Sequence, residues 1–278
     1  MNVLVTGGLG FIGTNLVERL RGPQFRVRLL DDLSAHPGAT APPEGADAWT
    51  TAPGFVRADV CDVDAMVRAC RGADAVIHLA ASTGIPDSLR DPLAHCETNA
   101  TGTLVVLEAC RRAGVARCVV ASSGAAVGDA PPPIHERAVP SPVSPYGASK
   151  LAAEAYCQAY RGAFGLATHA LRFSNVYGPH SGHKTSAVAT FIGTVLEDRP
   201  LTIYGDGEQT RDFVFVGDLV DGVAGALTAE RAAQCVYQLG SAVETSINAL
   251  VALLRDVAMK RLGRDVRVEH RPPRPGEV

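Results

Sequence analysis

Tyr146 and Lys150 are the residues whose types and spacing point most directly to chemistry. They stand four residues apart in Pro145–Phe164, a stretch with helical spacing that opens on a proline, so both side chains lie on one helix face. The chain has three lysines against 23 arginines, which gives a lysine at this spacing unusual weight. An adjacent ammonium lowers the pKa of a phenol, and the phenolate can then take a proton from an alcohol. The alternative is a solvated pair on a helix surface.

A glycine-rich turn stands near the start of the chain. Residues 6–13 read T-G-G-L-G-F-I-G and join a predicted strand to a predicted helix. Glycines leave room for a pyrophosphate, and the helix N-terminus offers free N–H groups and the positive end of its dipole. A tight turn without a ligand is the alternative. The residues that we expect to bind a dinucleotide here are Gly7, Gly10, Phe11, Ile12 and Gly13.

Asp31 follows the next predicted strand, 18 residues after Gly13. A carboxylate there can accept hydrogen bonds from both hydroxyls of an adenosine ribose and would repel a 2′-phosphate, so NAD is favoured over NADP. A solvated turn residue is the alternative, and for Asp59 the alternative is a helix N-cap. The further residues expected near this cofactor after the second and third strands are Asp32, Ser34, Asp59 and Val60.

The first half of the chain alternates short apolar runs with stretches of helical spacing. This alternation predicts an α/β fold, a doubly wound parallel sheet with helices on both faces. The predicted strands are Asn2–Thr6, Val27–Leu30, Phe55–Ala58, Ala75–Ala80, Arg117–Ser122 and Thr168–Phe173. The predicted helices are Phe11–Leu20, Asp64–Arg71, Pro92–Gly114 and Pro145–Phe164.

The division expected from this pattern is a dinucleotide-binding domain at residues 1–175 and a smaller, interleaved α/β lobe that binds substrate at 176–278. In the second half the regular alternation loosens. The elements predicted there are a helix at Ala187–Leu196, a hairpin-like segment at Leu201–Val216, and helices at Asp218–Thr228 and Ile247–Leu262.

Composition excludes several classes of partner. The formal net charge is −3, so no global field draws the chain to nucleic acid or to a membrane surface. No apolar run approaches the roughly 20 residues that span a bilayer, and no signal peptide is visible. Seven scattered cysteines without a C-x-x-C pair indicate reduced thiols. We therefore expect a cytoplasmic protein with no metal site.

Four further pieces accompany the glycine turn. They are His78-Leu79-Ala80-Ala81, Asn99, Ser122-Ser123 and Tyr146-Gly147-Ala148-Ser149-Lys150. Together they resemble the extended short-chain dehydrogenase/reductase superfamily, in particular its sugar-nucleotide epimerase/dehydratase branch, over the whole chain. The resemblance implies a Rossmann sheet that binds NAD. The residues that it adds to the cofactor site are Leu79, Ala80, Ala81 and Asn99.

The resemblance also implies the catalytic residues Ser123, Tyr146 and Lys150. Lys150 and the positive nicotinamide lower the pKa of Tyr146, which accepts a proton from a sugar hydroxyl while hydride leaves for NAD⁺. Ser123 would orient the same oxygen, or would merely cap backbone groups, with Ser122 as the alternative. Members of the branch are dimers, so we expect a homodimer through the two long helices, or else a monomer in which both helices simply cover the sheet.

The second half carries motifs that resemble the branch's substrate-binding segments. They are L-R-F-S-N-V-Y-G-P at residues 171–179, T-I-Y-G-D-G-E-Q-T-R-D-F-V-F-V-G-D at 202–218 and R-P-G-E at 274–277. Arginine suits diphosphate because its guanidinium can pair bidentately with phosphate, although each could be a surface ion-pair partner. The residues expected at a nucleoside-diphosphate sugar are Thr83, Ser88, Ser123, Asn175, Lys184, Arg211 and Arg274, of which Thr83, Ser88 and Lys184 could equally be solvated loop residues.

The branch begins each of its reactions by oxidising C4 of a sugar. Its dehydratases follow the equivalent of Ser123 with an acid and a base, whereas Gly124 and Ala125 stand here. The expected reaction is therefore 4-epimerisation of a UDP-hexose, UDP-N-acetylhexosamine or UDP-uronate through a transient 4-keto sugar. The alternatives are a dehydratase or reductase of the same branch, or a non-catalytic NAD-binding protein.

Two departures from the branch pattern affect the substrate and the small lobe. Val127 stands where a tyrosine usually shapes the sugar pocket, so the preferred sugar is expected to be unusual. His183 and Lys184 replace the uronate-binding pattern, which makes a neutral sugar the first expectation and leaves a uronate open. Members continue for a few dozen residues after R-P-G-E, so the small lobe is expected to be shortened at its C-terminus.

Overall fold

The computed structural model describes residues 1–34, 54–229 and 234–272. The chain divides into two compact units. The larger unit holds Met1–Phe173 and Gly217–Leu239, and the smaller holds Ser174–Val216 and Gly240–Val278. The division predicted at residue 175 lies close to the first crossing. Residues 217–239, however, return to the larger unit, because strand β10 (Val236–Leu239) extends its sheet.

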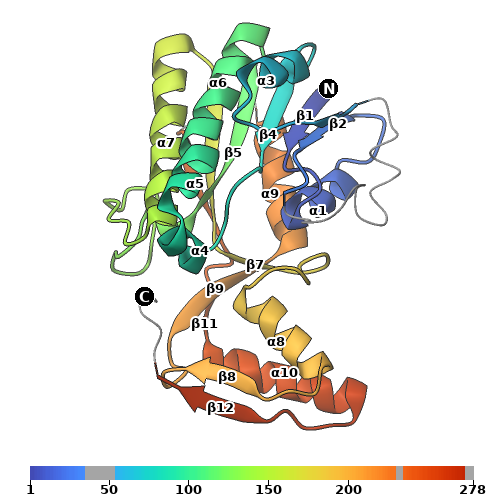
Figure 1. Ribbon diagram of the computed structural model, residues 1–278, viewed down its shortest axis with the longest axis vertical. Coiled ribbons are helices and arrows are strands. Elements are labelled where there is room, and N and C mark those ends of the chain that lie inside the picture. The colour runs from blue at the N-terminus through green and yellow to red at the C-terminus, as the bar shows by residue number, and fades with distance from the viewer. Residues whose placement is uncertain (35–53, 230–233, 273–278) are drawn as a thin grey trace. The chain divides into compact units, whose positions relative to one another are not determined.

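The larger unit is built on a seven-stranded sheet in which every pairing is parallel (Figure 1). Predicted strand positions are confirmed within a few residues, and β10 is an addition to them. Across the sheet the strands are β10, β6 (Ala167–Phe173), β5 (Arg117–Ser123), β4 (Ala75–His78), β1 (Asn2–Thr6), β2 (Arg26–Asp31) and β3 (Phe55–Arg57).

The strand order reverses at β1, which pairs with β2 on one side and β4 on the other. The connections after β1 and after β4 therefore run in opposite directions and leave a crevice at the carboxyl ends of these strands, where doubly wound folds bind ligands. The doubly wound parallel sheet expected from the sequence is confirmed. Both the glycine turn and His78–Ala81 stand at this reversal point.

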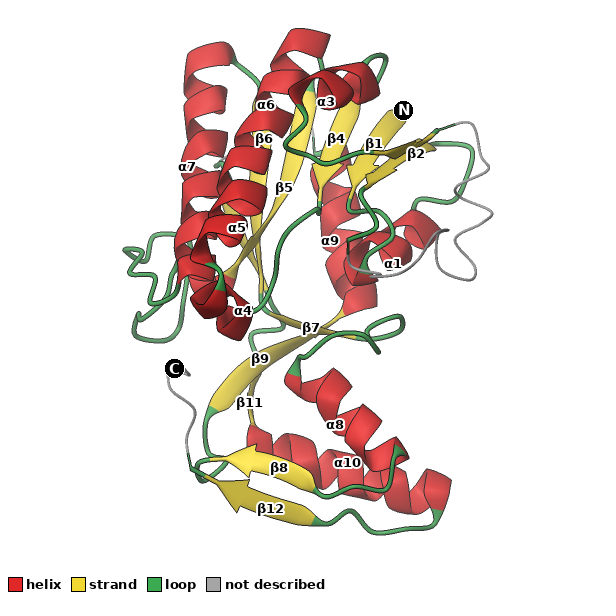
Figure 2. Ribbon diagram, viewed as in Figure 1, coloured by secondary structure: helices red, strands yellow, loops and turns green. Residues whose placement is uncertain are grey.

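Helices cover both faces of this sheet (Figure 2). On one face lie α3, α6 and α7, and α1 and α9 lie on the other, where Arg19 forms an ion pair with Asp221. The helices that the structure describes in the larger unit are α1 (Phe11–Arg19), α3 (Val63–Cys70), α4 (Ile85–Arg90), α5 (Pro92–Cys96), a π-helix (Glu97–Thr101), α6 (Gly102–Ala113), a 3₁₀ turn (Gly124–Ala126), α7 (Pro145–Phe164) and α9 (Val216–Thr228).

The α7 helix has clear local signals at both ends. The Ser144 hydroxyl accepts a hydrogen bond from Gly147 N at 3.1 Å, and Pro145 occupies the first turn, where its missing N–H costs nothing. Gly165 ends the helix at a φ of +70°, a conformation that glycine adopts without strain. The predicted bounds of this helix are therefore confirmed.

The predicted helix Pro92–Gly114 is instead three consecutive segments. A π-helical turn at Glu97–Thr101 separates α5 from α6, and it adds one residue to the helical ladder. The spacing of apolar residues in the sequence does not reveal such an insertion, because the residues on either side of it keep their helical period. The turn carries Asn99, one of the predicted cofactor residues.

One cluster of the larger unit's core lies between the sheet and the α3–α6–α7 face, and buried residues of α1 and α9 pack on the other face. The first cluster contains five of the seven cysteines, and burial helps to raise the pKa of Cys157 and Cys235, so these thiols pack as small apolar groups. The cysteines in this core are Cys70, Cys110, Cys118, Cys157 and Cys235.

The smaller unit contains two short sheets and two helices. One sheet contains the strands β7 (Asn175–Tyr177), β9 (Thr210–Phe215) and β11 (Glu244–Ser246). In the other sheet, β8 (Leu201–Tyr204) pairs in parallel with β12 (Val268–Arg271). Apolar side chains of α8 (Ala187–Leu196) and α10 (Ile247–Leu262) form its core together with β8.

The hairpin predicted at Leu201–Val216 is wrong. Both of its strands exist, but β8 and β9 belong to different sheets. Gly205 and Gly207 adopt φ values of +78° and +80° in the connection between them, and a Cβ on Gly207 would lie 2.2 Å from the Asn248 side chain. The glycines therefore redirect the chain from one sheet to the other rather than folding one strand back on its neighbour.

Candidate active site

The glycine turn packs closely against itself and against the end of β4. A Cβ on Gly13 would lie 2.3 Å from the Gly7 carbonyl oxygen, and one on Gly7, whose φ is +67°, would lie 2.5 Å from Ala80 N. These two glycines are thus required by the protein itself. A Cβ on Gly10 would lie 3.4 Å from its nearest neighbour, an ordinary contact, so the fold alone does not demand glycine there.

The N-terminus of α1 presents backbone donors without a side-chain cap. Gly10 is the N-cap, it makes no side-chain cap bond, and no acidic residue stands in the first turn. The Phe11 and Ile12 amides therefore stand among the N–H groups that a helix leaves without an intrahelical partner. Together with the dipole, this arrangement is suited to an anion.

Asp31 is joined directly to the glycine turn. Its Oδ2 accepts a hydrogen bond from Leu9 N at 3.1 Å, and its Oδ1 accepts one from Leu33 N at 2.9 Å. The side chain is buried at the end of β2, so it is not the solvated turn residue of the alternative reading. Each carboxylate oxygen has a further lone pair with which it can accept a hydroxyl.

The other acidic residues at this edge make local turns. Asp32 Oδ1 accepts from the Ser34 amide and hydroxyl at 2.9 and 2.7 Å, and Asp59 Oδ1 accepts from Cys61 N at 2.8 Å. The N-cap of α3 is Asp62, whose side chain accepts from Ala65 N, so the capping alternative for Asp59 is wrong. Val60 is a buried core residue.

His78 links the end of β4 to the elements beside it. Its Nδ1 lies 2.7 Å from the Thr6 hydroxyl and its Nε2 3.2 Å from the Thr103 hydroxyl. Burial lowers the pKa of His78 to about 3, so the ring is neutral at physiological pH. The residues that follow, Leu79, Ala80 and Ala81, are half-buried beside the glycine turn.

Asn99 uses its amide inside the protein. Its Oδ1 accepts from Ser82 N at 2.9 Å, while its Nδ2 donates to Ser82 O at 2.9 Å and to the Ser149 hydroxyl at 3.0 Å. Both N–H donors are therefore occupied, and the residue is fully buried. Asn99 fixes the loop after β4 to the first turn of α7, and π-helical insertions of this kind are frequent at functional sites.

Tyr146, Ser123 and Lys150 meet at the ends of β5 and α7. The Ser123 side chain acts on the Tyr146 phenol closely enough to lower its pKa, and Lys150 Nζ donates to the Ala121 carbonyl at 3.0 Å. Burial raises the pKa of the Tyr146 phenol and the Ser123 contact lowers it, while burial lowers the pKa of Lys150 to about 8. The two side chains are therefore not a solvated pair, and Lys150 is mostly protonated near pH 7.

The start of α7 lies directly against the turn after β5. A Cβ on Gly147 would lie 2.3 Å from the Ala125 carbonyl oxygen, so glycine permits this approach. Ser123 Oγ also accepts from Ala125 N at 3.2 Å, which fixes the hydroxyl beside Tyr146. Val127, in place of the usual tyrosine, is fully buried.

Glu154, Arg172 and His95 lie beside this group, and none of the three was predicted from the sequence as a site residue. Ser122 Oγ donates to Glu154 Oε1 at 2.5 Å, and Glu154 is paired bidentately with Arg172 at 2.8 and 2.7 Å. The Ser122 hydroxyl is thus committed to Glu154, which leaves Ser123 as the hydroxyl beside Tyr146. The available signal was Glu154 standing four residues after Lys150 on the same predicted face. His95, whose ring lies edge-on to Tyr146 at 6.2 Å between centroids, was also missed.

The predicted substrate residues are distributed between the two units. In the larger unit Thr83 is exposed, whereas Ser88 is fully buried and its hydroxyl donates to Ile85 O at 2.8 Å. The donor of Ser88 is thus used within α4, and its contact with substrate stays a prediction. Its helical position was hidden because the sequence predicted no helix at α4.

In the smaller unit, Asn175 begins β7 and is exposed, and Arg211 lies half-buried in β9, where Nη1 donates to Thr210 O at 2.7 Å. Lys184 is half-buried, and burial lowers its pKa. Arg274 lies outside the described residues. The positions of Asn175 and Arg211 in paired strands give both side chains a fixed backbone.

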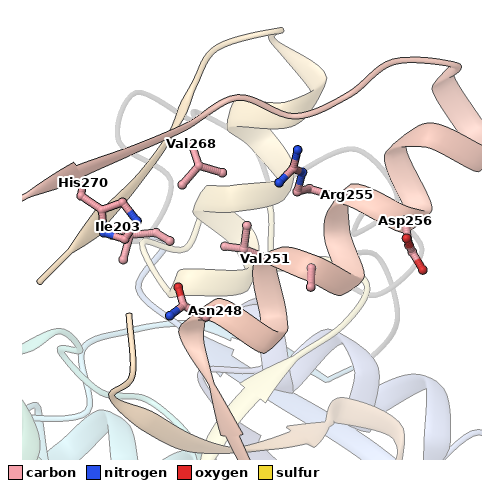
Figure 3. Close-up of a pocket in the computed structure, with 8 residues that line it drawn as sticks. Ile203, Asn248, Val251, Arg255, Asp256, Val268 and His270 are labelled. Carbon is pink, nitrogen blue, oxygen red and sulfur yellow. The ribbon is translucent and has the colours of Figure 1, made fainter. Parts of the chain in front are cut away.

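A hollow of about 480 Å³ lies in the smaller unit between α10 and the β8–β12 sheet (Figure 3). None of its eight lining residues belongs to the predicted site. Its lining is Ile203, Asn248, Val251, Ala252, Arg255, Asp256, Val268 and His270.

Within the parts of the chain that the structure describes, no cluster of three or more His, Cys, Asp or Glu side chains could hold a metal ion. The described helices also include none with the length and apolar character needed to cross a membrane.

Comparison with known proteins places this geometry in a family. Residues 3–240 match the model of the NAD dependent epimerase/dehydratase family. A UDP-glucose 4-epimerase of Mycolicibacterium smegmatis is 36% identical over 284 residues, which cover 100% of this chain and 88% of that protein.

Two solved structures are similar over the whole chain. A UDP-glucuronic acid 4-epimerase from Bacillus cereus, in complex with UDP-glucuronic acid and NAD, is 30% identical with a TM-score of 0.89 and 88% of its chain covered. DesIV, a dTDP-glucose 4,6-dehydratase from Streptomyces venezuelae, is 31% identical with a TM-score of 0.87 and 86% of its chain covered. With its reversal-point glycine turn, its Tyr146–Lys150 pair and this match over most of its length, the chain belongs to the NAD-dependent epimerase/dehydratase family.

Proposed function

We propose that this protein is an NAD-dependent 4-epimerase of a nucleoside-diphosphate sugar. In this reaction the C4–H bond of the sugar breaks and its electron pair leaves as hydride, while the O4–H proton passes to Tyr146. The 4-keto sugar then turns within the site, and hydride and proton return with hydride on the opposite face of C4. NAD⁺, when bound, takes up the hydride and gives it back.

The observation that carries the proposal is the placement of Tyr146 and Lys150 one turn apart on α7, with Lys150 held to β5 at the Ala121 carbonyl and with the Ser123 side chain acting on the Tyr146 phenol. In the unliganded protein, burial raises the pKa of Tyr146, so the phenol keeps its proton. A bound positive charge beside it, added to that of Lys150, would favour the phenolate. Tyr146 is then the proton acceptor, Ser123 orients the sugar O4, and Lys150 supports the negative phenolate.

Epimerisation is favoured over water loss by the residues after Ser123. Elimination requires an acid and a base beside the keto sugar, and the turn offers Gly124 and Ala125, neither of which can transfer a proton. Because no second proton-transferring pair follows, the keto sugar has one productive route, the return of hydride. The dehydratase similarity is then one of fold and opening chemistry.

The larger unit fits NAD at three points. Gly10 has room that the fold does not use, and the uncapped N-terminus of α1 offers amides to the pyrophosphate. The Asp31 carboxylate, held by Leu9 N and Leu33 N, would accept the ribose hydroxyls and disfavour a 2′-phosphate. We therefore assign NAD rather than NADP to this protein.

The substrate class follows from cationic residues in the smaller unit and from the relatives. Arg211 is suited to a diphosphate, and Asn175 to the sugar or phosphate. Arg274 is proposed as the second diphosphate residue on the sequence motif alone. The relatives named above act on UDP-glucose and bind UDP-glucuronic acid, so a UDP-hexose, UDP-N-acetylhexosamine or UDP-uronate is the proposed substrate.

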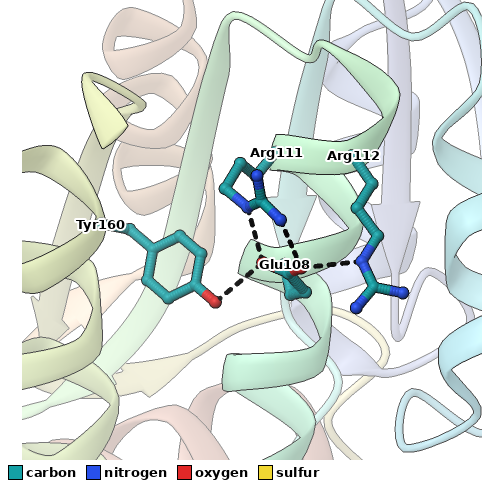
Figure 4. Close-up of polar contacts among 4 residues, drawn as sticks. All are labelled: Glu108, Arg111, Arg112 and Tyr160. Carbon is teal, nitrogen blue, oxygen red and sulfur yellow. Dashed lines mark hydrogen bonds and ion pairs between the residues drawn. The ribbon is translucent and has the colours of Figure 1, made fainter. Parts of the chain in front are cut away.

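We also propose that the protein is a homodimer through α5, α6 and α7. Glu108 of α6 accepts hydrogen bonds from Arg111, Arg112 and the Tyr160 hydroxyl of α7 (Figure 4), which joins the two helices into one surface. Leu93 on α5 is 81% exposed, and Tyr156 on α7 is 37% exposed. In a symmetric dimer these apolar side chains would be buried between the two copies, with the long helices of each copy forming the contact.

The test is product analysis with intact protein. UDP-glucose, UDP-N-acetylglucosamine and UDP-glucuronate are each incubated with protein and NAD⁺, and the sugar products are resolved by NMR while absorbance at the NADH band is followed. The expected result is a C4-inverted sugar from at least one substrate without net NADH. Stoichiometric NADH release, or a stable keto-sugar as product, would reject epimerisation.

A further inference from the structure

One face of α7 contacts three consecutive residues of β5. Lys150 Nζ donates to the carbonyl of Ala121 at 3.0 Å, and Glu154 Oε1 accepts from the Ser122 hydroxyl at 2.5 Å. The side chain of the next residue, Ser123, lowers the pKa of the Tyr146 phenol. Because Tyr146, Lys150 and Glu154 are spaced by four residues, they lie on the same side of the helix, and their contacts fix both its rotation and its position along β5.

Arg172 closes this arrangement from the neighbouring strand. It stands beside Ser122 in the β5–β6 register, and its Nε and Nη2 donate to the two oxygens of Glu154 at 2.8 and 2.7 Å. Arg172 and Glu154 are 3% and 4% exposed. One guanidinium thus ties the helix to the sheet through both oxygens of Glu154.

A gain in stability does not account for such a pair. Buried ion pairs lose so much hydration that apolar side chains of similar volume are often equally or more stable, by about 1–4 kcal/mol. Apolar contacts have no preferred direction, so they do not by themselves select one rotation of the helix. A bidentate pair and a serine hydroxyl select one helix rotation, whereas a slip of one turn would move Tyr146 by about 5.4 Å.

We propose that Glu154 and Arg172 are positioning residues for the reaction, which hold α7 in the one register that places the Tyr146 phenol against Ser123. Neither side chain contacts the reacting atoms. They act through Ser122, which ties the helix to the strand one residue before Ser123. The inference rests on the role proposed above for Tyr146, and its test separates the two.

The test uses the double variant Glu154→Met with Arg172→Met in the full chain. Removing both charges avoids leaving one buried charge without its partner, a change that costs about 3–5 kcal/mol. The matched control is Arg255→Met with Asp265→Met, which removes a bidentate pair of the same type, at 3.0 and 2.8 Å, that is exposed in the smaller unit.

Two readouts are measured on each variant. The first is the titration of Tyr146 in NAD-free protein, followed by NMR of ¹³Cζ-labelled tyrosine and assigned by the signal lost in Tyr146→Phe. The second is kcat and KM for the sugar that turns over. In the Met–Met variant we expect the Tyr146 pKa to rise by about half a unit or more, because a phenolate loses a hydrogen bond. We also expect kcat to fall at least about tenfold with KM within about twofold, because misplacement acts on the reacting geometry.

The control pair is expected to change neither readout. A folded Met–Met variant with wild-type titration and wild-type kcat would overturn the proposal. If this variant does not fold, Ser122→Ala decides by the same readouts, since it removes one hydroxyl and buries no charge. An unchanged titration and kcat in Ser122→Ala would then count against positioning. If wild-type protein turns over no sugar, the proposed function fails, while a shifted Tyr146 titration in the variant would still support the positioning role.

Discussion

A Cβ atom on Gly13 would lie 2.3 Å from the carbonyl oxygen of Gly7, so these two residues meet with no space for a methyl group between them. Gly10 stands between them in sequence yet differs from both. Its φ is −72° with extended ψ, which any residue adopts, and a Cβ there would make an ordinary contact at 3.4 Å. The fold therefore accounts for Gly7 and Gly13, whereas for Gly10 we propose close approach by the pyrophosphate of NAD as the reason for a glycine.

Alanine at Gly13 and alanine at Gly10 are expected to have different effects, the first mainly on stability and the second mainly on NAD binding. Gly13→Ala should lower the free energy of unfolding by about 2 kcal/mol or more, because the methyl group meets backbone. Gly10→Ala should lose less stability, about 1 kcal/mol or less from a poorer N-cap, but should bind NAD at least about tenfold more weakly, a loss of about 1.4 kcal/mol. Urea titration and calorimetric NAD binding measure both. Wild-type NAD affinity in Gly10→Ala would contradict a pyrophosphate at this turn.

Tyr146→Phe is expected to lower kcat by about 10²–10⁴-fold, the range supplied by a positioned acid or base. The ring remains beside His95 and only the hydroxyl that contacts Ser123 is lost, so NAD affinity and melting temperature should stay close to wild type. Tyr156→Phe, on the outer surface of the same helix, is the matched control. A Tyr146→Phe protein with near-normal turnover would exclude this phenol as the proton acceptor.

The activity should decline as the pH rises through about 8. Burial lowers the pKa of Lys150 to about 8, and only its ammonium form can support the phenolate that we propose for Tyr146. As pH rises past that value the folded protein loses this charge, and kcat should fall with it. Lys150→Arg keeps its charge to much higher pH, so whatever activity it retains should lack this descending limb. A limb at the same pH in Lys150→Arg would assign it to another group.

Much of the fold and part of the site were predictable because their signals are local. The glycine turn, the caps of α7 and the i, i+4 spacing of Tyr146 and Lys150 each lie within one short segment. Six of the seven parallel strands follow from buried apolar runs between helical stretches, whereas β10 was not predicted. These features needed no knowledge of which distant segments meet.

The features that were missed depend on distant pairing. Strands β11 and β12 have three and four residues, too few for a period, and β8 joins β12 rather than its sequence neighbour β9. Glu154 and Arg172 come from a helix and a strand whose contact only the folded sheet creates. The burial of Ser88 likewise depends on α4, which its Gly-Ile-Pro start concealed.

If the proposed dimer forms through α5, α6 and α7, charged substitutions on that surface should lower the mass of the protein in solution from that of a dimer to that of a monomer. Leu93→Asp with Tyr156→Asp places charges on exposed apolar positions of α5 and α7, and an unpaired charge inside an interface core is costly. We expect a dimer for the wild type and a monomer for this variant by light scattering. Leu253→Asp, at a position of α10 whose exposure lies between those of Leu93 and Tyr156, should leave the mass unchanged. A monomeric wild type would mean that α5–α7 only cover the sheet.

The folded protein should lose stability as the solution is acidified below neutral pH, in part because of His78. Its ring lies between the Thr6 and Thr103 hydroxyls, and burial lowers its pKa to about 3, while the unfolded chain takes up that proton near pH 6.5. Between these values the unfolded state binds more protons, so the free energy of unfolding falls with pH by up to about 1.4 kcal/mol per unit for each such group. His169, whose pKa burial lowers to about 4, adds to the slope. His78→Asn should be less stable at pH 7 yet show a shallower decline between pH 6 and pH 5 in urea titrations, whereas exposed His180→Asn should keep the wild-type slope. Equal slopes in His78→Asn and the wild type would mean that the His78 proton does not distinguish the folded from the unfolded state.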